Sequence, residues 1–265
     1  MKYGFVGLGN MGTAILKGMI VSGKYLPANI LGYDPFVGSS HVAAEMGATI
    51  CPSLAEVVLA DVLLLAVKPQ VMPPVLKELR ELNLDRAHKL VISVAAGRTL
   101  TFLQDGLGPG LPIARVMPNI NAKVGASTSA FAVNSLCTES HKNTVLDLFA
   151  TIGAIIELPE EQFSIFTAIA GSSPAFSYMY IDALARAAVR GGLSRDKALE
   201  IAASTVFGSA KMILESREHP FTLIDQVSSP GGTTIEGICA LQEHGFESAV
   251  HKAVAAAALK DKNLA

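Results

Sequence analysis

A glycine-rich loop near the start of the chain constrains the fold more than any other feature. Residues 2–6 are apolar enough for a short buried strand, and residues 13–20 repeat apolar side chains at helical spacing. The six residues between them are Gly7-Leu8-Gly9-Asn10-Met11-Gly12. Strand, G-x-G-x-x-G and helix in this order are the fingerprint of a Rossmann domain that binds a dinucleotide. Its first glycine permits the tight turn, its second lets the pyrophosphate approach, and its third lets helix and strand pack closely.

An acidic residue lies where such a domain places its ribose partner. A second predicted strand, residues 29–33, ends in Asp34, which is 22 residues beyond Gly12. A carboxylate there accepts hydrogen bonds from a free 2′-hydroxyl and repels a 2′-phosphate, and no Arg or Lys stands between Pro35 and Glu45. These residues therefore favour NADH over NADPH. The alternative is that Asp34 is only a turn residue before Pro35.

Further strands follow at the intervals of an α/β domain. We expect them at residues 61–67, 89–94, 111–117, 128–133 and 154–158, with helices near 54–59, 73–80 and 140–151. This pattern predicts a sheet of about eight strands. The segments Lys68-Pro69-Gln70 and Ala95-Ala96-Gly97 end two of these strands and are candidates to line the cofactor cleft, because ligands bind beyond the carboxyl ends of such strands. Lys68 is alternatively a solvated strand-end residue.

The pattern changes after residue 159. Ser172-Ser173-Pro174 is typical of a helix start, with Ser as the cap and Pro in the first turn, and Gly191-Gly192 ends that helix. Further helices are expected at 195–216, 220–227, 233–243 and 246–262. We therefore predict an α/β fold: a Rossmann domain at residues 1–159, then an all-α substrate and dimerisation domain at 160–265. The first of these helices is apolar nearly all round, which predicts burial and a dimer through this half, unless its faces pack on the sheet domain.

A second glycine-rich loop, residues 228–234, precedes one of these helices. Its sequence is Ser228-Ser229-Pro230-Gly231-Gly232-Thr233-Thr234. Bare backbone N–H groups and the positive end of a helix dipole together make a site for a small anion such as a carboxylate. Two hydroxyl groups, on Thr233 and Thr234, stand at the same place. The alternative is an ordinary capped helix after a turn.

Composition and charge exclude several classes of protein. Only 17% of the residues are charged, the net charge is −2 and no block of like charges occurs, which argues against nucleic-acid and membrane-surface partners. Cys51, Cys137 and Cys239 are far apart and outside any metal-ligand spacing, so we expect reduced core residues of a cytoplasmic protein. No signal-peptide pattern and no spanning apolar stretch is expected.

Candidates for a general acid are few in the second half. No Lys occurs at residues 143–196, and His219 and His244 are interpreted as helix-terminal or surface residues. Tyr178 and Tyr180 are interpreted as packing residues, although either is a possible proton donor. Reduction of a ketone makes an alkoxide that needs a proton, whereas reduction of a protonated imine gives a neutral amine. An iminium acid would need only anion-binding backbone, a hydroxyl near nitrogen and a positioned nicotinamide.

The chain resembles the pyrroline-5-carboxylate reductases over nearly its full length. The motifs that carry the resemblance are the residues 5–12, Ala66-Val67-Lys68-Pro69-Gln70, Ser93-Val94-Ala95-Ala96-Gly97, Arg115-Val116-Met117-Pro118-Asn119, Gly171-Ser172-Ser173-Pro174-Ala175-Phe176 and the 228–234 loop. The resemblance implies a Rossmann domain and a helical domain that interlocks with a partner, with homodimers often assembled into rings. It implies reduction of 1-pyrroline-5-carboxylate to L-proline, the last step of proline biosynthesis, with NADPH or NADH.

Site residues carry over by position. Together with the fingerprint residues and Asp34, which follow from spacing, the resemblance gives a full set of expected dinucleotide contacts. They are Val6, Gly7, Leu8, Gly9, Asn10, Met11, Gly12, Asp34, Ser53, Ala66, Val67, Lys68, Pro69, Val94, Ala95 and Ala96. The expected substrate contacts are Glu160, Ser229, Gly231, Gly232, Thr233 and Thr234. In this resemblance the N–H groups of Gly231, Gly232 and Thr233 cradle the carboxylate. The hydroxyl of Thr234 stands at the ring nitrogen as the catalytic group, and Glu160 lies near the substrate.

Three departures from the family pattern are visible. The chain has Pro118-Asn119-Ile120-Asn121 where the family often reads Pro-Asn-Thr-Pro, and Ser173 where it usually has Gly. Asp34-Pro35 replaces the Ser/Asn-Arg pair typical of NADP users. A rival interpretation, a 3-hydroxyacid dehydrogenase, needs a Lys on the first long helix of the second domain, where this chain has none. A dinucleotide-sensing protein without turnover would not need Thr233 and Thr234.

Overall fold

The computed structural model describes residues 1–82, 84–85 and 89–263. Its contacts form two compact units, Met1–Gly171 with Ala257–Ala265, and Ser172–Ala256. The boundary between these units lies twelve residues after the domain boundary expected between residues 159 and 160. The expected domain boundary stays a prediction. The extra residues belong to a helical segment that packs on the end of the sheet, where Phe163, Phe166 and Ala170 are buried against Ala130 and Ala132.

The first unit is built on one mixed sheet in the order β3-β2-β1-β4-β5-β6-β7-β8. Its strands are β1 Tyr3–Val6, β2 Ile30–Tyr33, β3 Thr49–Ile50, β4 Val62–Leu65, β5 Leu90–Ser93, β6 Ile113–Met117, β7 Ser127–Val133 and β8 Gly153–Glu157. Neighbouring strands are parallel except β6 and β7. The predicted α/β class is confirmed, and the seven predicted strands lie within two residues of these bounds. β3 was missed because two residues are too few to show a period.

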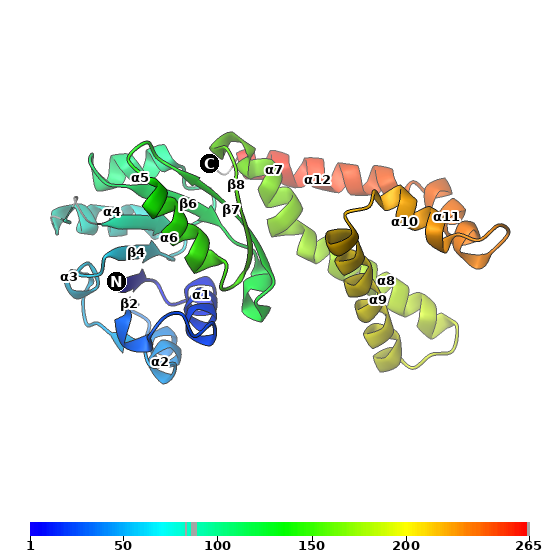
Figure 1. Cartoon of the computed structure of the whole chain (residues 1–265), viewed down its shortest axis with the longest axis horizontal. Helices are drawn as coiled ribbons and strands as arrows, with labels where there is room; N and C mark the ends of the chain where they lie inside the picture. Colours follow the sequence, from blue (N-terminus) through cyan, green and yellow to red (C-terminus); the bar gives the residue numbers. More distant parts are fainter. Residues whose placement is uncertain (83, 86–88, 264–265) are drawn as a thin grey trace. The chain divides into compact units, whose positions relative to one another are not determined.

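Both faces of the sheet are buried, which is why its central strands are apolar without alternation. Successive side chains enter different cores: Phe5 packs on one face and Val6 on the other. The first core lies under α1 Asn10–Val21 and α6 Glu139–Phe149. The second lies under α3 Leu54–Val57, α4 Met72–Glu81 and α5 Leu100–Leu107 (Figure 1).

Among the helices that flank the sheet, two were not predicted. α2 Val37–Glu45 buries only Ala43, so its sequence shows hardly any apolar stripe. α5 begins after Thr99, whose side chain accepts the N–H of Phe102 at 3.1 Å. That threonine cap is the signal that would have found α5. Three short 3-10 helices, η1 Pro27–Asn29, η2 Ile120–Val124 and η3 Glu160–Gln162, complete the unit.

A continuous helical run replaces the predicted helix start at Ser172. α7 Phe163–Phe166 passes through a π-helix, η4 Thr167–Ser172, into α8 Ser173–Arg190. The predicted cap is wrong, because Ser172 has helical backbone angles and makes no capping bond. Pro174 has no N–H to donate to the preceding turn, and the carbonyl of Ala170 accepts instead from Nδ2 of the buried Asn119 at 2.9 Å. A wide turn at such a point is the usual response to a missing helical donor.

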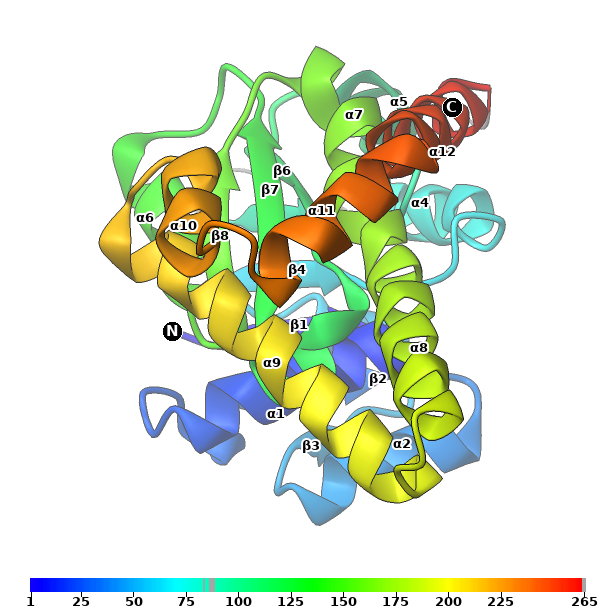
Figure 2. The same cartoon turned by 90° about the vertical axis from the view of Figure 1, so that its right-hand side faces the viewer.

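The described residues of the second unit form helices joined by loops, without a strand. The unit holds α8, α9 Arg195–Ser216, α10 Pro220–Val227, α11 Thr233–Glu243 and part of α12 Phe246–Lys262. The bounds of the last four are those predicted. α8 and α9 form an antiparallel hairpin (Figures 1 and 2) whose buried residues are all alanines, Ala185, Ala198 and Ala202. Small side chains let the two helices approach closely.

Large apolar side chains of this unit are exposed in the single chain. Met179 on α8 is 74% exposed, and Phe207 and Leu214 on α9 are 70% and 77% exposed. The prediction that α8 is buried on several sides is therefore wrong for the chain alone, where only Ala185 of that helix is buried. Apolar surface of this extent is typical of an interface. No helix in the described part has the length and hydropathy needed to cross a membrane.

Candidate active site

A cavity of about 450 Å³ opens where the strand order reverses, at the carboxyl ends of β1, β2 and β4. Parallel sheets of this kind bind ligands at such a point. Ten residues line this dinucleotide cavity: Gly7, Gly9, Asp34, Pro35, Phe36, Ser39, Ala66, Val67, Lys68 and Val71. Six of them, Gly7, Gly9, Asp34, Ala66, Val67 and Lys68, are among the predicted cofactor contacts.

The three fingerprint glycines occupy three different environments. Gly7 has φ +95° and donates its N–H to the carbonyl of Tyr33 at 2.8 Å. A Cβ on Gly12 would lie 2.4 Å from the carbonyl oxygen of Gly7, so α1 can pack here only without a side chain. A Cβ on Gly9 would meet nothing within 4 Å. The space above Gly9 is thus open to a ligand, as the fingerprint requires.

Asp34 holds the glycine loop and lines the cavity at the same time. Its Oδ2 accepts the N–H of Leu8 at 2.8 Å, and its Oδ1 accepts the N–H of Phe36 at 2.9 Å. The second bond is the turn contact that the alternative interpretation expected. A carboxylate has about four acceptor positions, so these two bonds leave capacity for ribose hydroxyls. The turn role and the ribose role are therefore compatible.

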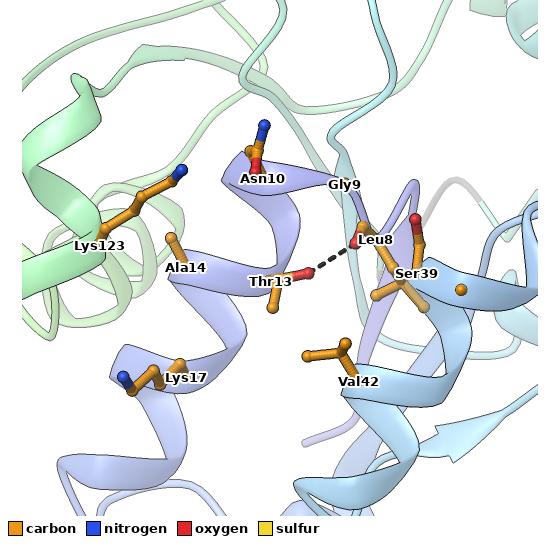
Figure 3. A pocket seen from close by; sticks show the side chains of 10 residues that line it. Leu8, Gly9, Asn10, Thr13, Ala14, Lys17, Ser39, Val42 and Lys123 are labelled. Carbon is orange, nitrogen blue, oxygen red and sulfur yellow. Dashed lines mark hydrogen bonds between the residues drawn. The ribbon is translucent and has the colours of Figure 1, made fainter.

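A second cavity, of about 460 Å³, adjoins the first because both are lined by Gly9 and Ser39. Asn10, Thr13 and Lys17 reach it from α1, and Lys123 reaches it from η2 (Figure 3). Thr13 Oγ1 donates to the carbonyl of Leu8 at 2.6 Å and ties the helix to the loop. Lys17 and Lys123 therefore place two cations in the cavity that adjoins that of Asp34, although residues 35–45 contain no Lys or Arg. The i, i+3, i+7 spacing of Asn10, Thr13 and Lys17 places them on one face of α1, so the sequence contained a signal for Lys17. Lys123 approaches this cavity only because the fold brings η2 close to α1.

The 228–234 loop ends in a glycine N-cap. Gly231 has φ +65°, and Gly232 donates its N–H to the carbonyl of Ser229 at 3.0 Å. A Cβ on Gly232 would lie 2.3 Å from Oγ of Ser229, so a side chain there would require Ser229 to move. Gly232 is the N-cap of α11 and provides no side-chain capping bond. The N–H groups that open a helix have no intrahelical partner, so those of Thr233 and Thr234 are available to an anion.

Comparison with known proteins decides the family. The sequence model described as pyrroline-5-carboxylate reductase dimerisation matches residues 160–264, and the one described as NADP oxidoreductase coenzyme F420-dependent matches residues 2–97. The pyrroline-5-carboxylate reductase of Escherichia coli (strain K12) is 43% identical over 268 residues, which cover 99% of this chain and 98% of the relative. The chain belongs to the pyrroline-5-carboxylate reductase family. It is therefore an NAD(P)-dependent oxidoreductase.

Further relatives and solved structures agree with this assignment. The pyrroline-5-carboxylate reductase of Methanosarcina acetivorans is 40% identical over 267 residues, 99% of this chain and 97% of the relative. The structure of the Coxiella burnetii reductase superposes with a TM-score of 0.94 at 31% identity and covers 100% of this chain and 98% of that one. The Plasmodium falciparum reductase, solved with NADP bound, gives 0.88 at 31% identity with the same coverage.

Other predicted cofactor contacts of the reductase lie around the cavity without lining it. Val6 ends β1, and Met11 and Gly12 lie in the first turn of α1. Ser53 is the N-cap of α3, and Val94 extends β5 by donating its N–H to the carbonyl of Leu65 at 3.0 Å. The remaining predicted contacts, Leu8, Asn10, Pro69, Ala95 and Ala96, belong to the loops after β1, β4 and β5 or to the start of α1. Their contacts with a dinucleotide stay predictions.

The carboxylate of Glu160 accepts hydrogen bonds from two other residues of the chain. Its Oε1 accepts from Nη1 of Arg115 and from the N–H of Leu100, both at 2.8 Å. The Arg115 side chain is 7% exposed, and its guanidinium lies 4.4 Å from the ring centre of Phe163. A buried cation needs such partners, so Glu160 has a structural role whether or not it contacts substrate. Its substrate role stays a prediction.

The ionisable side chains of the second unit are engaged at helix ends or exposed. His219 caps α10 by accepting the N–H of Phe221, and His244 ends α11 with a ring nitrogen 2.9 Å from the carbonyl of Ala240. Their prediction as helix-terminal residues is confirmed. Tyr178 is 58% exposed, so its predicted packing role is wrong for the single chain. Tyr180 is 38% exposed and packs its ring against that of Phe246, with the ring centres 5.9 Å apart.

The cysteines do not form the predicted set of core residues. Cys51 is buried and Cys137 is half-buried, but Cys239 is exposed on α11. Burial raises the pKa of the Cys137 thiol to about 11, so that thiol is unreactive at neutral pH. Within the described residues no three His, Cys, Asp or Glu side chains gather as a metal site would require.

The open space above Gly9 generates a prediction. Gly9→Ala should leave the free energy of unfolding unchanged or raise it by up to about 1 kcal/mol, because its φ of −68° suits alanine. It should weaken NAD(P)H binding roughly 10- to 100-fold, because the new Cβ meets the ligand. Gly237→Ala, on α11 of the second unit and also with open space around it, is the matched control. Equal dissociation constants for the two variants in a fluorescence titration would contradict the placement of the cofactor.

Proposed function

We propose that the chain reduces the C=N bond of 1-pyrroline-5-carboxylate to give L-proline, with hydride from NAD(P)H, and that the 228–234 loop holds the substrate carboxylate. The observation that carries this proposal is the glycine N-cap of α11, which presents first-turn N–H groups beside two threonine hydroxyls. It occurs in a chain whose other unit is a dinucleotide-binding domain of a reductase family.

The residues of the first unit fit a dinucleotide. The pyrophosphate would lie over Gly9 at the start of α1, whose first turn contains no acidic residue to repel it. Asp34 would accept the hydroxyls of the adenine ribose, and Ala66, Val67 and Lys68 would line the adenine side of the cavity. The reduced nicotinamide supplies the hydride. The chain's part is to place that ring and to keep it oriented.

The residues of the 228–234 loop would orient the substrate. The N–H groups of Gly231 and Thr233 would bind the carboxylate, and Gly232 would exchange its bond to the carbonyl of Ser229 for one to the same carboxylate. The hydroxyl of Thr234, the second residue of α11, would form a hydrogen bond with the ring nitrogen. Fixing both ends of a small ring in this way leaves one carbon facing the nicotinamide, which is catalysis by proximity and orientation.

The chemistry requires no strong acid from the protein. In the protonated imine, the positive nitrogen already withdraws electrons from the carbon that accepts the hydride. The hydride pair forms the new C–H bond, the π pair becomes the lone pair of nitrogen, and the product is a neutral secondary amine. His219 and His244 are both held at helix ends, in keeping with this mechanism.

We also infer a cytoplasmic homodimer, assembled through the second unit and capable of forming a ring of dimers. The exposed Phe207 and Leu214 support a second copy as the partner, because the matching family model is a dimerisation model. The net charge of −2 and the mixed surface charges support the absence of nucleic-acid and membrane partners.

Substitution of Thr234 tests the proposed catalytic hydroxyl. Thr234→Val should lower kcat/KM for 1-pyrroline-5-carboxylate roughly 10- to 100-fold, the effect of losing one hydrogen bond to a charged group. Thr234→Ser should recover most of it. NAD(P)H dissociation constants should stay within about twofold, because the loop holds substrate and not cofactor. Thr222→Val, on exposed α10 surface, is the control. Equal loss of cofactor binding and turnover would count against this role.

Substitution of Asp34 tests cofactor choice. Steady-state rates with each cofactor should show a native preference for NADH, and Asp34→Ser should raise the NADPH to NADH ratio of kcat/KM roughly tenfold or more, because it removes the charge that repels the 2′-phosphate. Lys17 and Lys123 in the adjoining cavity would then attract that phosphate. Glu45→Gln removes the same charge from the exposed end of α2 and should not change the ratio. An unchanged ratio in Asp34→Ser would show that Asp34 does not select the cofactor.

The dimer is tested by sedimentation of the full chain. Phe207→Asp places a charge on a side chain that is 70% exposed in the monomer and buried in the proposed dimer. An unpaired buried charge is strongly destabilising, so the variant should sediment as a monomer at concentrations where the native chain is a dimer or larger. Val21→Asp, at a residue 75% exposed on α1, is the control. A native chain that sediments as a monomer would refute the assembly.

A further inference from the structure

Arg98 joins two loops at the carboxyl edge of the sheet. Its Nε and Nη2 both donate to the carbonyl of Pro69, at 3.1 and 2.8 Å. Its guanidinium carbon lies 4.6 Å from the ring centre of Phe102 on α5, so the ring fixes the plane of the group. Arg98 belongs to the segment after β5, and Pro69 to the segment after β4. These loops are 29 residues apart in the sequence and are fastened by one side chain.

Both loops belong to the proposed cofactor site, and the inference rests on that proposed function. Val67 and Lys68 precede Pro69 and line the dinucleotide cavity, and Val71 lines it from the other side of the turn. Ala95 and Ala96 are predicted dinucleotide contacts and precede Arg98. Gly97 between them has φ +68°, a turn that lets the chain fold back so that Arg98 points at Pro69.

The second loop is held from its other side as well. The N–H of Leu100, two residues after Arg98, donates to Oε1 of Glu160, which also binds the buried Arg115. Leu100 therefore fixes this segment to the frame of the unit. Arg98 thereby connects the Pro69 turn to the same frame. Within residues 66–72 this turn has its own bonds from the N–H of Val71 to the carbonyl of Lys68, at 2.9 Å, and from the N–H of Met72 to the carbonyl of Pro69, at 3.4 Å.

We propose that Arg98 is a positioning residue for the dinucleotide: it holds the 66–71 loop in the conformation that binds NAD(P)H. Arg98 contacts no reacting atom in this role. The planar guanidinium is suited to it because two of its donors reach one carbonyl while its face stacks on a ring, which a lysine ammonium cannot do. Without the clamp the loop would sample other conformations, and apparent affinity falls in proportion to the competent fraction.

The test compares NADH and NADPH binding to the full native chain, Arg98→Met, Arg98→Lys and Arg80→Met, by fluorescence titration. Arg98→Met should raise the dissociation constants roughly tenfold, as a competent fraction of about one tenth requires. Arg98→Lys keeps one donor and should give an intermediate value. In both variants KM for the cofactor should rise while kcat at saturating cofactor stays within about twofold. Arg80→Met, in the exposed last turn of α4, removes the same charge and should behave as the native chain.

Thermal unfolding separates positioning from stability. A lower melting temperature with native dissociation constants would show a purely structural arginine and overturn the proposal. So would equal weakening in Arg80→Met. If Arg98→Met does not unfold cooperatively, the test rests on Arg98→Lys alone. A rise in the KM for the cofactor at unchanged kcat would then support the proposal, and an unchanged KM would overturn it. A native chain that binds neither NADH nor NADPH would instead refute the proposed function, and the role of Arg98 with it.

Discussion

The two helices that the proposed reaction uses, α1 and α11, begin at a glycine rather than at a side chain that caps them. Gly9 precedes α1 and Gly232 precedes α11, and neither provides a side-chain bond to the first turn. A helix start leaves several N–H groups without partners, and a glycine leaves the space beside them open. By contrast α5 and α6, which we place at no site, are capped by Thr99 and Thr138. Both helix starts are therefore suited to the main-chain anion binding that we propose for the pyrophosphate and for the substrate carboxylate.

Short-range signals were sufficient for most of the fold. The bounds of α9 to α12 could be predicted because each begins or ends at Gly, Pro or a polar cap, and the parallel strands because burial on both faces makes them continuously apolar. The π-helix before α8 could not, because a Ser-Ser-Pro segment has the same sequence in a capped start and in a widened turn. The two are distinguished by Asn119, 51 residues before Ala170 in the sequence, which donates a hydrogen bond to the carbonyl of Ala170.

The site shows the same division between local and distant information. Gly7, Gly9, Gly12 and Asp34 follow from spacing, because the fingerprint specifies a backbone geometry. The bond from Leu8 to Asp34 is implied by that geometry but is not visible in a pattern. The contacts of Glu160 with Arg115, and the approach of Lys123 to α1, depend on how distant segments pack. The sequence therefore predicted residues that lie within a single loop, but it did not predict contacts between residues of different loops.

In the proposed mechanism an electrophilic C=N bond lets main-chain amides and one hydroxyl suffice. This can be checked in a crystal structure of the assembled enzyme with L-proline and oxidised cofactor. We expect the product carboxylate within hydrogen-bonding distance of the N–H groups of Gly231, Gly232 and Thr233, with the amine at the hydroxyl of Thr234. A carboxylate bound elsewhere, or a Lys or His poised at the carbon that received the hydride, would contradict it.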